Sequence, residues 1–265
     1  MKTLVINLDL EKDRMNFQRK QLGNLGVEFE RLSAVRIESK DELSYQTLSQ
    51  TWERPLRISE VSCFLSHKRA WSKVIDYQQP MLILEDDAYL TSNISCVLQE
   101  LERLDNLDYV CLEVRGEKQK KLVAQKVRKF FCESSLFRLY QGRSGAAAYV
   151  LWPSGAKILM EGTGKGSKAG LADKFINATY LLRAYQLEPA IAIQLDQCHF
   201  HQISPPIDVS SSISSVSVPK ERNVLRYFIF KGRRVLGELK ILFNYLKYRK
   251  VAIKREVQLS RRFSQ

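Results

Sequence analysis

Met81-Leu82-Ile83-Leu84-Glu85-Asp86-Asp87 joins four consecutive apolar residues directly to three carboxylates. An uninterrupted apolar run of this length, preceded by a helical pattern and Pro80, predicts a central strand that is covered on both faces. In open α/β sheets, ligands bind beyond the carboxyl ends of the strands. We therefore expect the three acids to lie at the mouth of a binding site.

Predicted strands and helices alternate along nearly 200 residues of the chain, and this alternation predicts an α/β layer architecture. Strands are expected over residues 3–8, 27–32, 109–114, 137–140, 146–151 and 190–194. Helices are expected over residues 11–25, 94–104, 154–161 and 173–185, and another begins near Ser59 as its N-cap and ends before Pro80. Residues 36–58 are polar and irregular, a candidate active-site loop, and residues 115–135 form a basic, variable-looking stretch.

The net charge of +13 is concentrated near one end of the 265-residue chain. The segment from Pro219 to Gln265 carries 14 Lys or Arg against three Glu, whereas residues 1–218 are almost neutral. We therefore expect a catalytic domain over residues 1–218 and a basic helical tail over residues 219–265. A domain that binds nucleic acid would be basic over one whole face, so no nucleic-acid partner is expected.

Cysteine spacing and hydropathy indicate a cytoplasmic protein. None of the five cysteines forms a CxxC pair, which argues against a zinc knuckle or a disulfide framework and favours reduced thiols. No apolar segment approaches the roughly 20 residues that a spanning helix needs. The first apolar run is too short for a signal peptide and is interrupted by Asp9.

The three adjacent carboxylates favour a metal site. Adjacent carboxylates repel one another and are costly to bury unless a cation neutralises them. Hard oxygen ligands suit Mg²⁺ or Mn²⁺ held by a few carboxylates together with phosphate oxygens. A solvated acidic turn is the alternative, and the residues alone leave both open. Because the chain has no G-x-x-x-x-G-K-[ST] motif, a nucleotide would be held through the metal instead of a P-loop.

Several short motifs follow one another in a characteristic order. They are Val5-Ile6-Asn7-Leu8 with Asp13-Arg14, Phe29-Glu30-Arg31-Leu32-Ser33-Ala34-Val35, Ser59-Glu60-Val61-Ser62-Cys63-Phe64-Leu65-Ser66-His67, Ile83-Leu84-Glu85-Asp86-Asp87-Ala88, Gly145-Ala146-Ala147-Ala148-Tyr149-Val150-Leu151 and Ala172-Asp173-Lys174. In this order they resemble glycosyltransferase family 25, the lipopolysaccharide-type β-glycosyltransferases, from Leu4 to about Ile213. Two positions depart from the family pattern: Ser62 stands where Gly is usual, and Lys174 stands where the family has a second Asp.

The resemblance implies a single nucleotide-sugar-binding domain of the GT-A type with a mixed central sheet. It also implies an inverting transfer of a hexose, galactose from UDP-galactose, onto a lipooligosaccharide or lipopolysaccharide acceptor. In such a reaction a divalent cation stabilises the leaving pyrophosphate, and a carboxylate takes the proton of the acceptor hydroxyl. We expect Glu85, Asp86 and Asp87 to bind Mn²⁺ or Mg²⁺ and Asp173 to act as the base. The donor-binding candidates are Asn7, Leu8, Arg14, Ala34, Glu60, Ser66, His67 and Gln194, and Tyr149 is the acceptor-binding candidate. Residues 36–58 and 115–135 are both expected to select the acceptor.

Each of these assignments has an alternative. Asp173 can be a plain helix cap, His67 a core histidine and Arg14 a solvated charge. His199 and His201 fit a surface pair better than metal ligands. For the whole chain, the alternatives are a UDP-glucose-dependent glucosyltransferase of the same pathway, a metal-dependent phosphoryl or nucleotidyl transferase, or a non-catalytic binding module.

The basic tail has the pattern of a helix that lies in a membrane interface. Apolar residues recur at helical spacing over residues 224–246 and alternate with Lys and Arg. Residues 247–265 have fewer apolar side chains and seven bases, so this half is expected to dock on an anionic membrane. The expected location is the inner face of the bacterial inner membrane, beside a lipid-linked oligosaccharide acceptor.

Overall fold

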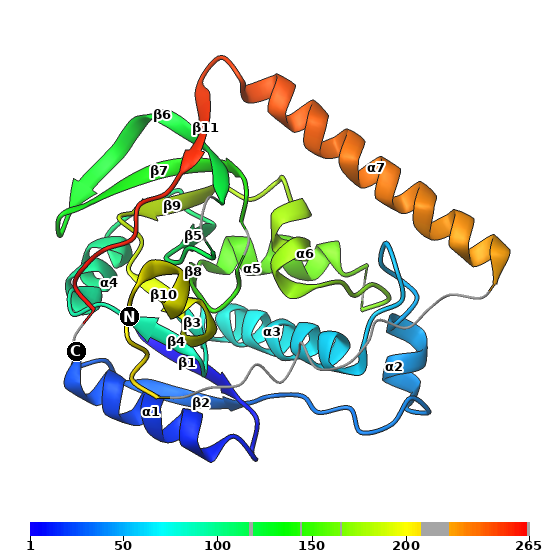
Figure 1. Ribbon diagram of the computed structural model, residues 1–265, viewed down its shortest axis with the longest axis horizontal. Coiled ribbons are helices and arrows are strands. Elements are labelled where there is room, and N and C mark those ends of the chain that lie inside the picture. Colours follow the sequence, from blue (N-terminus) through cyan, green and yellow to red (C-terminus); the bar gives the residue numbers. More distant parts are fainter. Residues whose placement is uncertain (117–118, 144, 165, 208–222, 264–265) are drawn as a thin grey trace.

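A mixed nine-stranded sheet forms the centre of the molecule (Figure 1). The computed structural model describes residues 1–116, 119–143, 145–164, 166–207 and 223–263. The strands lie in the order β11 (Ala252–Glu256), β6 (Lys120–Phe131), β7 (Ser134–Gln141), β9 (Ala184–Glu188), β5 (Tyr109–Cys111), β8 (Ala148–Leu151), β3 (Met81–Glu85), β1 (Lys2–Asn7) and β2 (Phe29–Ser33). The sheet contains both parallel and antiparallel pairs, so the predicted α/β class with a mixed central sheet is confirmed.

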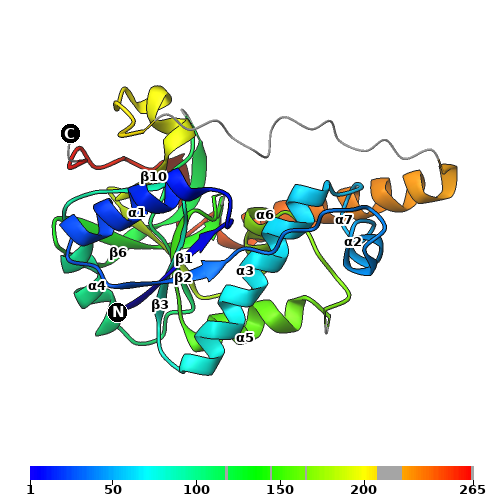
Figure 2. The ribbon, with the colours of Figure 1, turned by 90° about the horizontal axis from the view of Figure 1, so that it is seen from below.

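Helices cover both faces of the sheet, as Figure 2 shows from below. One hydrophobic core joins the sheet to α1 (Lys12–Asn24) and α4 (Ile94–Glu102). A second core joins the opposite face to α2 (Leu43–Leu48), α3 (Ile58–Tyr77), α5 (Pro153–Gly162) and α6 (Ala172–Ala178). The remaining elements are α7 (Val224–Tyr248), the pair β4 (Ala88–Leu90) and β10 (Ala192–Gln194), and the 3-10 helix η1 (Leu195–His201).

The β3 strand occupies the position that its sequence predicts. Leu82, Ile83 and Leu84 have no exposed surface, because both faces of the sheet are covered at this point. β3 pairs with β1 in parallel and with β8 antiparallel. The register places Glu85 opposite Ile6, so the acids leave the sheet beside the carboxyl end of β1.

Several local expectations differ from the structure, and residues 36–58, expected to be irregular, contain the helix α2. The helix expected over residues 173–185 ends at Ala178, and Ala184–Glu188 instead forms β9, which pairs with both β5 and β7. The basic stretch within 115–135 contains the twelve-residue strand β6, whose exposed lysines and arginines mask the alternation of a strand. Helix α3 begins at Ile58, not after Ser59, because the Glu60 carboxylate accepts the backbone N–H of Arg57 at 2.8 Å.

The C-terminal segment is part of the sheet and not a separate tail. β11 extends the sheet beyond β6, and Arg255 forms an ion pair with Glu188 of β9. Farther on, the Ser260 amide donates to the Ala190 carbonyl at 2.8 Å, and the Phe263 ring packs 5.0 Å from the ring of Tyr89. Of the predicted tail, α7 is helical as expected, whereas the segment that follows it folds into the body.

One disulfide corrects the expectation of five reduced thiols. The sulfur atoms of Cys96 and Cys132 are bonded, and their Cα atoms are 6.1 Å apart. The pairing has no sequence signature because 36 residues separate the two cysteines, and only the folded chain brings α4 beside the turn between β6 and β7. Cys63, Cys111 and Cys198 are free thiols. None of the described helices is both long enough and apolar enough to cross a bilayer.

Candidate active site

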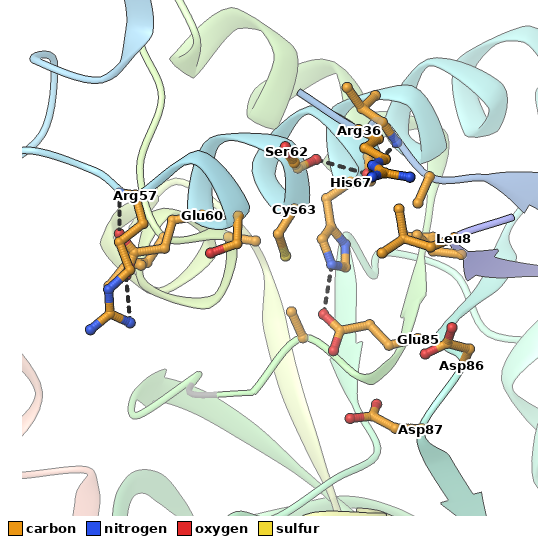
Figure 3. Close-up of a pocket in the computed structure, with 18 of the residues that line it drawn as sticks. Leu8, Arg36, Arg57, Glu60, Ser62, Cys63, His67, Glu85, Asp86 and Asp87 are labelled. Carbon is orange, nitrogen blue, oxygen red and sulfur yellow. Dashed lines mark hydrogen bonds and ion pairs between the residues drawn. The ribbon is translucent and has the colours of Figure 1, made fainter. Parts of the chain in front are cut away.

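A cleft of about 860 Å³ opens at the carboxyl ends of β1 and β3, against the first half of α3 (Figure 3). The cleft brings together most of the residues that the sequence predicts: Leu8, Arg14, Ala34, Glu60, Ser66, His67, Glu85, Asp86, Asp87, Asp173 and Gln194. Residues of the predicted loop 36–58 also line it. Asn7 and Tyr149 are not among its lining residues.

Asp86 is held by the first strand and the first helix. Its carboxylate accepts a hydrogen bond from Asn7 Nδ2 at 2.7 Å and lies 3.3 Å from the Arg14 guanidinium. Burial raises the pKa of Asp86, although these two partners favour its charged form. Asn7, predicted to contact the donor, is 2% exposed and instead positions this carboxylate.

Glu85 ends a chain of hydrogen bonds that reaches into the core. His67 lies 2.9 Å from Glu85 through Nε2 and 2.9 Å from the Tyr149 hydroxyl through Nδ1. Trp71 Nε1 donates to the same hydroxyl at 3.0 Å. Since indole N–H only donates, the Tyr149 hydroxyl is free to donate to Nδ1, and His67 then donates from Nε2 to Glu85. Burial works against ionisation of Glu85, yet the hydrogen bond from His67 and the charges of Arg115 and Arg14 hold its pKa below the ordinary value.

This chain corrects the role predicted for Tyr149. Its side chain has no exposed surface and lies behind His67, so it cannot contact an acceptor in the cleft. Tyr149 instead fixes the orientation and tautomer of the His67 ring. Because both ring nitrogens of His67 are already engaged, the ring positions Glu85 and is a poor candidate for a metal ligand.

Asp87, Gln194 and Asp196 each contribute one buried oxygen atom to this part of the site. Gln194 Nε2 donates to Glu85 at 3.2 Å and lies 3.4 Å from Asp87 Oδ2, so the amide bridges the two acids. Asp87 Oδ1, Gln194 Oε1 and Asp196 Oδ1 are buried and have no hydrogen-bond partner among the described residues. Burial, followed by the charges of Glu85 and Asp86, raises the pKa of Asp87 well above its ordinary range.

These oxygens fit a divalent cation. Carboxylate and amide oxygens are the hard ligands that Mg²⁺ and Mn²⁺ take, and a cation would neutralise the repulsion that raises the Asp87 pKa. Asp196 has no local sequence signature, and only the turn from β10 into η1 brings it to the cleft. His199 and His201 lie farther along the same 3-10 helix, outside the cleft lining.

Basic side chains line the same cleft as the acids. Besides Arg14, they are Arg36, Lys40, Arg57 and Arg115. Single basic residues in loops are common, so no sequence pattern distinguishes these four. Together they supply the positive charge that phosphate oxygens require.

Glu60 stabilises the start of α3, and its carboxylate is engaged in hydrogen bonds within the protein. Arg54 donates two hydrogen bonds to its carboxylate, at 2.7 and 2.9 Å, while the Arg57 amide supplies a third. Burial alone would raise the pKa of Glu60, but these partners hold it below the ordinary value. The side chain is 5% exposed, so it shapes the cleft wall chiefly by fixing both arginines.

Asp173 lies in the first turn of α6 and lines the cleft, as predicted. Its Oδ1 accepts the Lys174 amide at 2.7 Å. Burial raises the pKa of the Cys63 thiol, and the charges of Glu85, Asp173 and Asp87 raise it further. The charge of Asp173 and the charges of Glu85 and Asp87 therefore all affect the Cys63 thiol, which places Asp173 near the acids that follow β3.

The comparison with known proteins agrees with this geometry. Residues 1–168 match the profile of glycosyltransferase family 25 (LPS biosynthesis protein). The chain belongs to glycosyltransferase family 25. It is therefore a transferase, and the matched region contains the acids after β3 as well as the first half of α3.

Three relatives show how far the similarity extends. A Haemophilus influenzae protein, provisionally named a glycosyltransferase, is 24% identical over 198 residues, covering 72% of this chain and 69% of its own length. An Aedes aegypti glycosyltransferase 25 family member is 26% identical over 40% of this chain and 20% of its own length. Human procollagen galactosyltransferase 2 is 29% identical over 41% of this chain and 19% of its own length. The last two are much longer proteins, of which this chain covers about a fifth.

Proposed function

We propose that this family 25 glycosyltransferase transfers a hexose, galactose from UDP-galactose, onto a lipid-linked oligosaccharide with inversion. The observation that carries the proposal is the set of buried oxygens of Asp87, Gln194 and Asp196, which have no partner among the described residues and lie in a cleft that basic side chains also line. A nucleoside diphosphate with a divalent cation matches both kinds of side chain in such a cleft. The galactosyltransferase name of the human relative supports galactose as the first sugar to test.

The donor would bind between the acids and the basic side chains, in the manner of a GT-A domain. Asp87, Gln194 and Asp196 would hold Mn²⁺ or Mg²⁺, with Glu85 and Asp86 adding negative charge. When bound, such a cation acts as a Lewis acid that stabilises the leaving diphosphate. Arg14 and Arg115 line the same cleft and would pair with phosphate oxygens.

Asp173 is the proposed general base. In a single displacement, a carboxylate takes the proton from the acceptor hydroxyl while that oxygen attacks the anomeric carbon. Among the described cleft residues, Asp173 comes from α6, whereas Glu85, Asp86 and Asp87 all follow β3. The base and the donor site therefore come from different elements.

The donor assignment is tested by thermal unfolding and donor hydrolysis over a panel of nucleotides and UDP-sugars. We expect UDP to raise the melting temperature only with Mn²⁺ or Mg²⁺, and UDP-galactose to be hydrolysed faster than UDP-glucose. A preference for UDP-glucose would reassign the sugar. Equal stabilisation by other nucleotides, with no hydrolysis of any UDP-sugar, would favour a phosphoryl or nucleotidyl transferase.

The base assignment is tested by Asp173→Asn. Because the base acts on the acceptor, the variant should lose transfer at least a hundredfold while binding UDP and Mn²⁺ like the parent enzyme. Lys174→Gln is the matched control, since Lys174 is exposed on the same turn. Calorimetry that shows lost UDP binding in Asp173→Asn would make Asp173 a donor contact instead.

A further inference from the structure

Helix α7 lies at the edge of the molecule (Figure 1), and its main contacts with the sheet are to β7. Only Phe230 and Asn244 are buried among its 25 residues. Asn244 Nδ2 donates to the Tyr140 carbonyl at 3.0 Å, and the Tyr248 ring stacks 4.1 Å from the ring of Tyr140. These contacts fix how the helix is rotated on the body.

The face of α7 that points away from these contacts is apolar over its whole length. At 100° per residue, its large side chains fall within an arc of about 140° opposite Phe230 and Asn244. They are Val224, Leu225, Phe228, Ile229, Val235, Leu236, Leu239, Leu242, Phe243 and Leu246, and each is 44–72% exposed. We call this set the outer face of α7. No other described part of the chain buries it.

The charges around the outer face select an anionic partner. Lys240 and Lys247 border it on one side and Lys231 on the other, while Arg249 and Lys250 follow the helix directly. Glu238 is the only acidic residue within α7. A continuous apolar stripe with basic borders is the pattern of a helix that lies in the headgroup region of a bilayer.

We propose that the outer face of α7 docks the enzyme on an anionic membrane surface. The apolar side chains would enter the boundary between headgroups and acyl chains, and the flanking lysines would pair with lipid phosphates. The residues after α7, which the sequence favours as the anchor, are bound to β6, Ala190 and Tyr89 instead. The membrane contact is therefore assigned to the helix and not to the segment beyond it.

Docking through this face would place the loop that leads to the cleft wall close to the membrane. The Arg233 guanidinium donates to the carbonyls of Gln50 and Trp52, at 2.7 and 3.0 Å. The same loop continues to Arg54, which binds Glu60 at the cleft wall. A lipid-linked acceptor would thus be presented beside the site. This consequence rests on the proposed function, whereas the docking itself does not.

The test compares two exposed phenylalanines that differ only in location. Phe243 on the outer face is 72% exposed, and Phe130, on the distant β6, is 67% exposed. Binding of the full chain to vesicles is measured by sedimentation, with either zwitterionic lipid or a mixture rich in anionic lipid. Phe243→Glu should lower the partition coefficient on anionic vesicles at least about tenfold, because it replaces an inserted ring with a charge. Phe130→Glu should leave it unchanged.

A second set of variants isolates the charges. In Lys240→Gln, Lys247→Gln and the double variant, the partition coefficient on anionic vesicles should fall about fivefold for each lysine removed at low salt. The difference from the parent enzyme should vanish in about 0.5 M salt. Hydrolysis of the UDP-sugar in solution should be unaffected in all these variants, which separates failure of docking from failure of the proposed function.

Two results would overturn the proposal. One is undiminished vesicle binding by Phe243→Glu. The other is a dimer in light scattering that Phe243→Glu converts to a monomer without any vesicle binding by the parent enzyme, which would assign the outer face to a second copy of the chain.

Discussion

Asp87 is the residue on which the proposed chemistry depends most directly. Asp87→Asn keeps the shape of the side chain but removes the charge that a cation would require. We expect donor hydrolysis to fall by about a hundredfold or more, the usual scale for losing an electrostatic stabiliser. The melting temperature without ligand should not fall, because the buried carboxylate is destabilised by its neighbours. Asp76→Asn, an exposed change in α3, is the control. Full activity of Asp87→Asn, or full activity in EDTA, would refute the assignment.

Glu113 is a second buried acid, which the sequence did not distinguish. Its Oε1 accepts the Ala147 amide at 2.7 Å and the Ala148 amide at 3.3 Å. Gly145, at φ 91°, leaves room for the carboxyl group, since a Cβ there would lie 2.4 Å from the Glu113 carboxyl carbon. Burial, followed by the charge of Glu85, raises the pKa of Glu113 to about 8.

This raised pKa predicts how stability changes with pH. The folded protein keeps a proton on Glu113 that the unfolded chain releases above pH 4.5, its ordinary pKa. The contribution of Glu113 to stability is therefore complete below pH 4.5 and is lost as pH rises towards 8. Glu113→Gln keeps the acceptor oxygen and cannot ionise. Between pH 4.5 and 8 the free energy of unfolding of the parent should therefore fall by a few kcal/mol more than that of the variant. Urea unfolding across this range measures the difference, with the exposed change Glu28→Gln as the control. Parallel pH profiles for parent and Glu113→Gln would contradict it.

At the scale of elements, the start of α3 depends on the pair formed by Arg54 and Glu60. Removing the guanidinium in Arg54→Ala leaves a carboxylate that is only 5% exposed without its main partner. We expect a loss of about 1–3 kcal/mol in the free energy of unfolding, since Arg54 itself is partly solvated. Arg103→Ala breaks a surface pair with Glu100 and should cost less than about 0.5 kcal/mol. Equal effects in the two variants would show that the Arg54 pair adds nothing special to the helix.

The edge strand β11 gives a prediction opposite to the one that the sequence alone suggests. If residues 247–265 were a detached tail, their removal would leave the body intact. Because β11 covers β6 and Arg255 neutralises Glu188, deletion of residues 252–265 should lower the melting temperature by several degrees and promote aggregation through the exposed edge. Lys254→Ala, an exposed change on the same strand, should have little effect. A truncated protein as stable and monodisperse as the parent would contradict this account.

For the molecule as a whole, the sequence predicts those features that a local pattern determines, and misses those that depend on contacts between distant segments. The apolar run of β3, bounded by Pro80 and Glu85, predicts a strand covered on both faces, and the structure agrees. The helix expected over residues 173–185 runs into the first two residues of β9, because this short strand has no strand signature apart from its place between β5 and β7. Asp196 and Arg115 reach the cleft through long-range topology, which no local pattern records. Tyr149 was placed in the cleft by resemblance, whereas its burial follows from the packing of α3 on β8.

The order of the strands in the sheet also affects folding during synthesis. β6 is synthesised about 120 residues before β11, its partner at the edge. At about 5–20 residues per second, a nascent chain carries β6 without that partner for roughly 6–25 seconds. During this interval the open edge can pair with a strand of another nascent chain. Lys126, Arg128 and Lys129 lie on the part of β6 that does not pair with β11, so their charges discourage pairing with a second copy along this edge both during synthesis and in the finished protein.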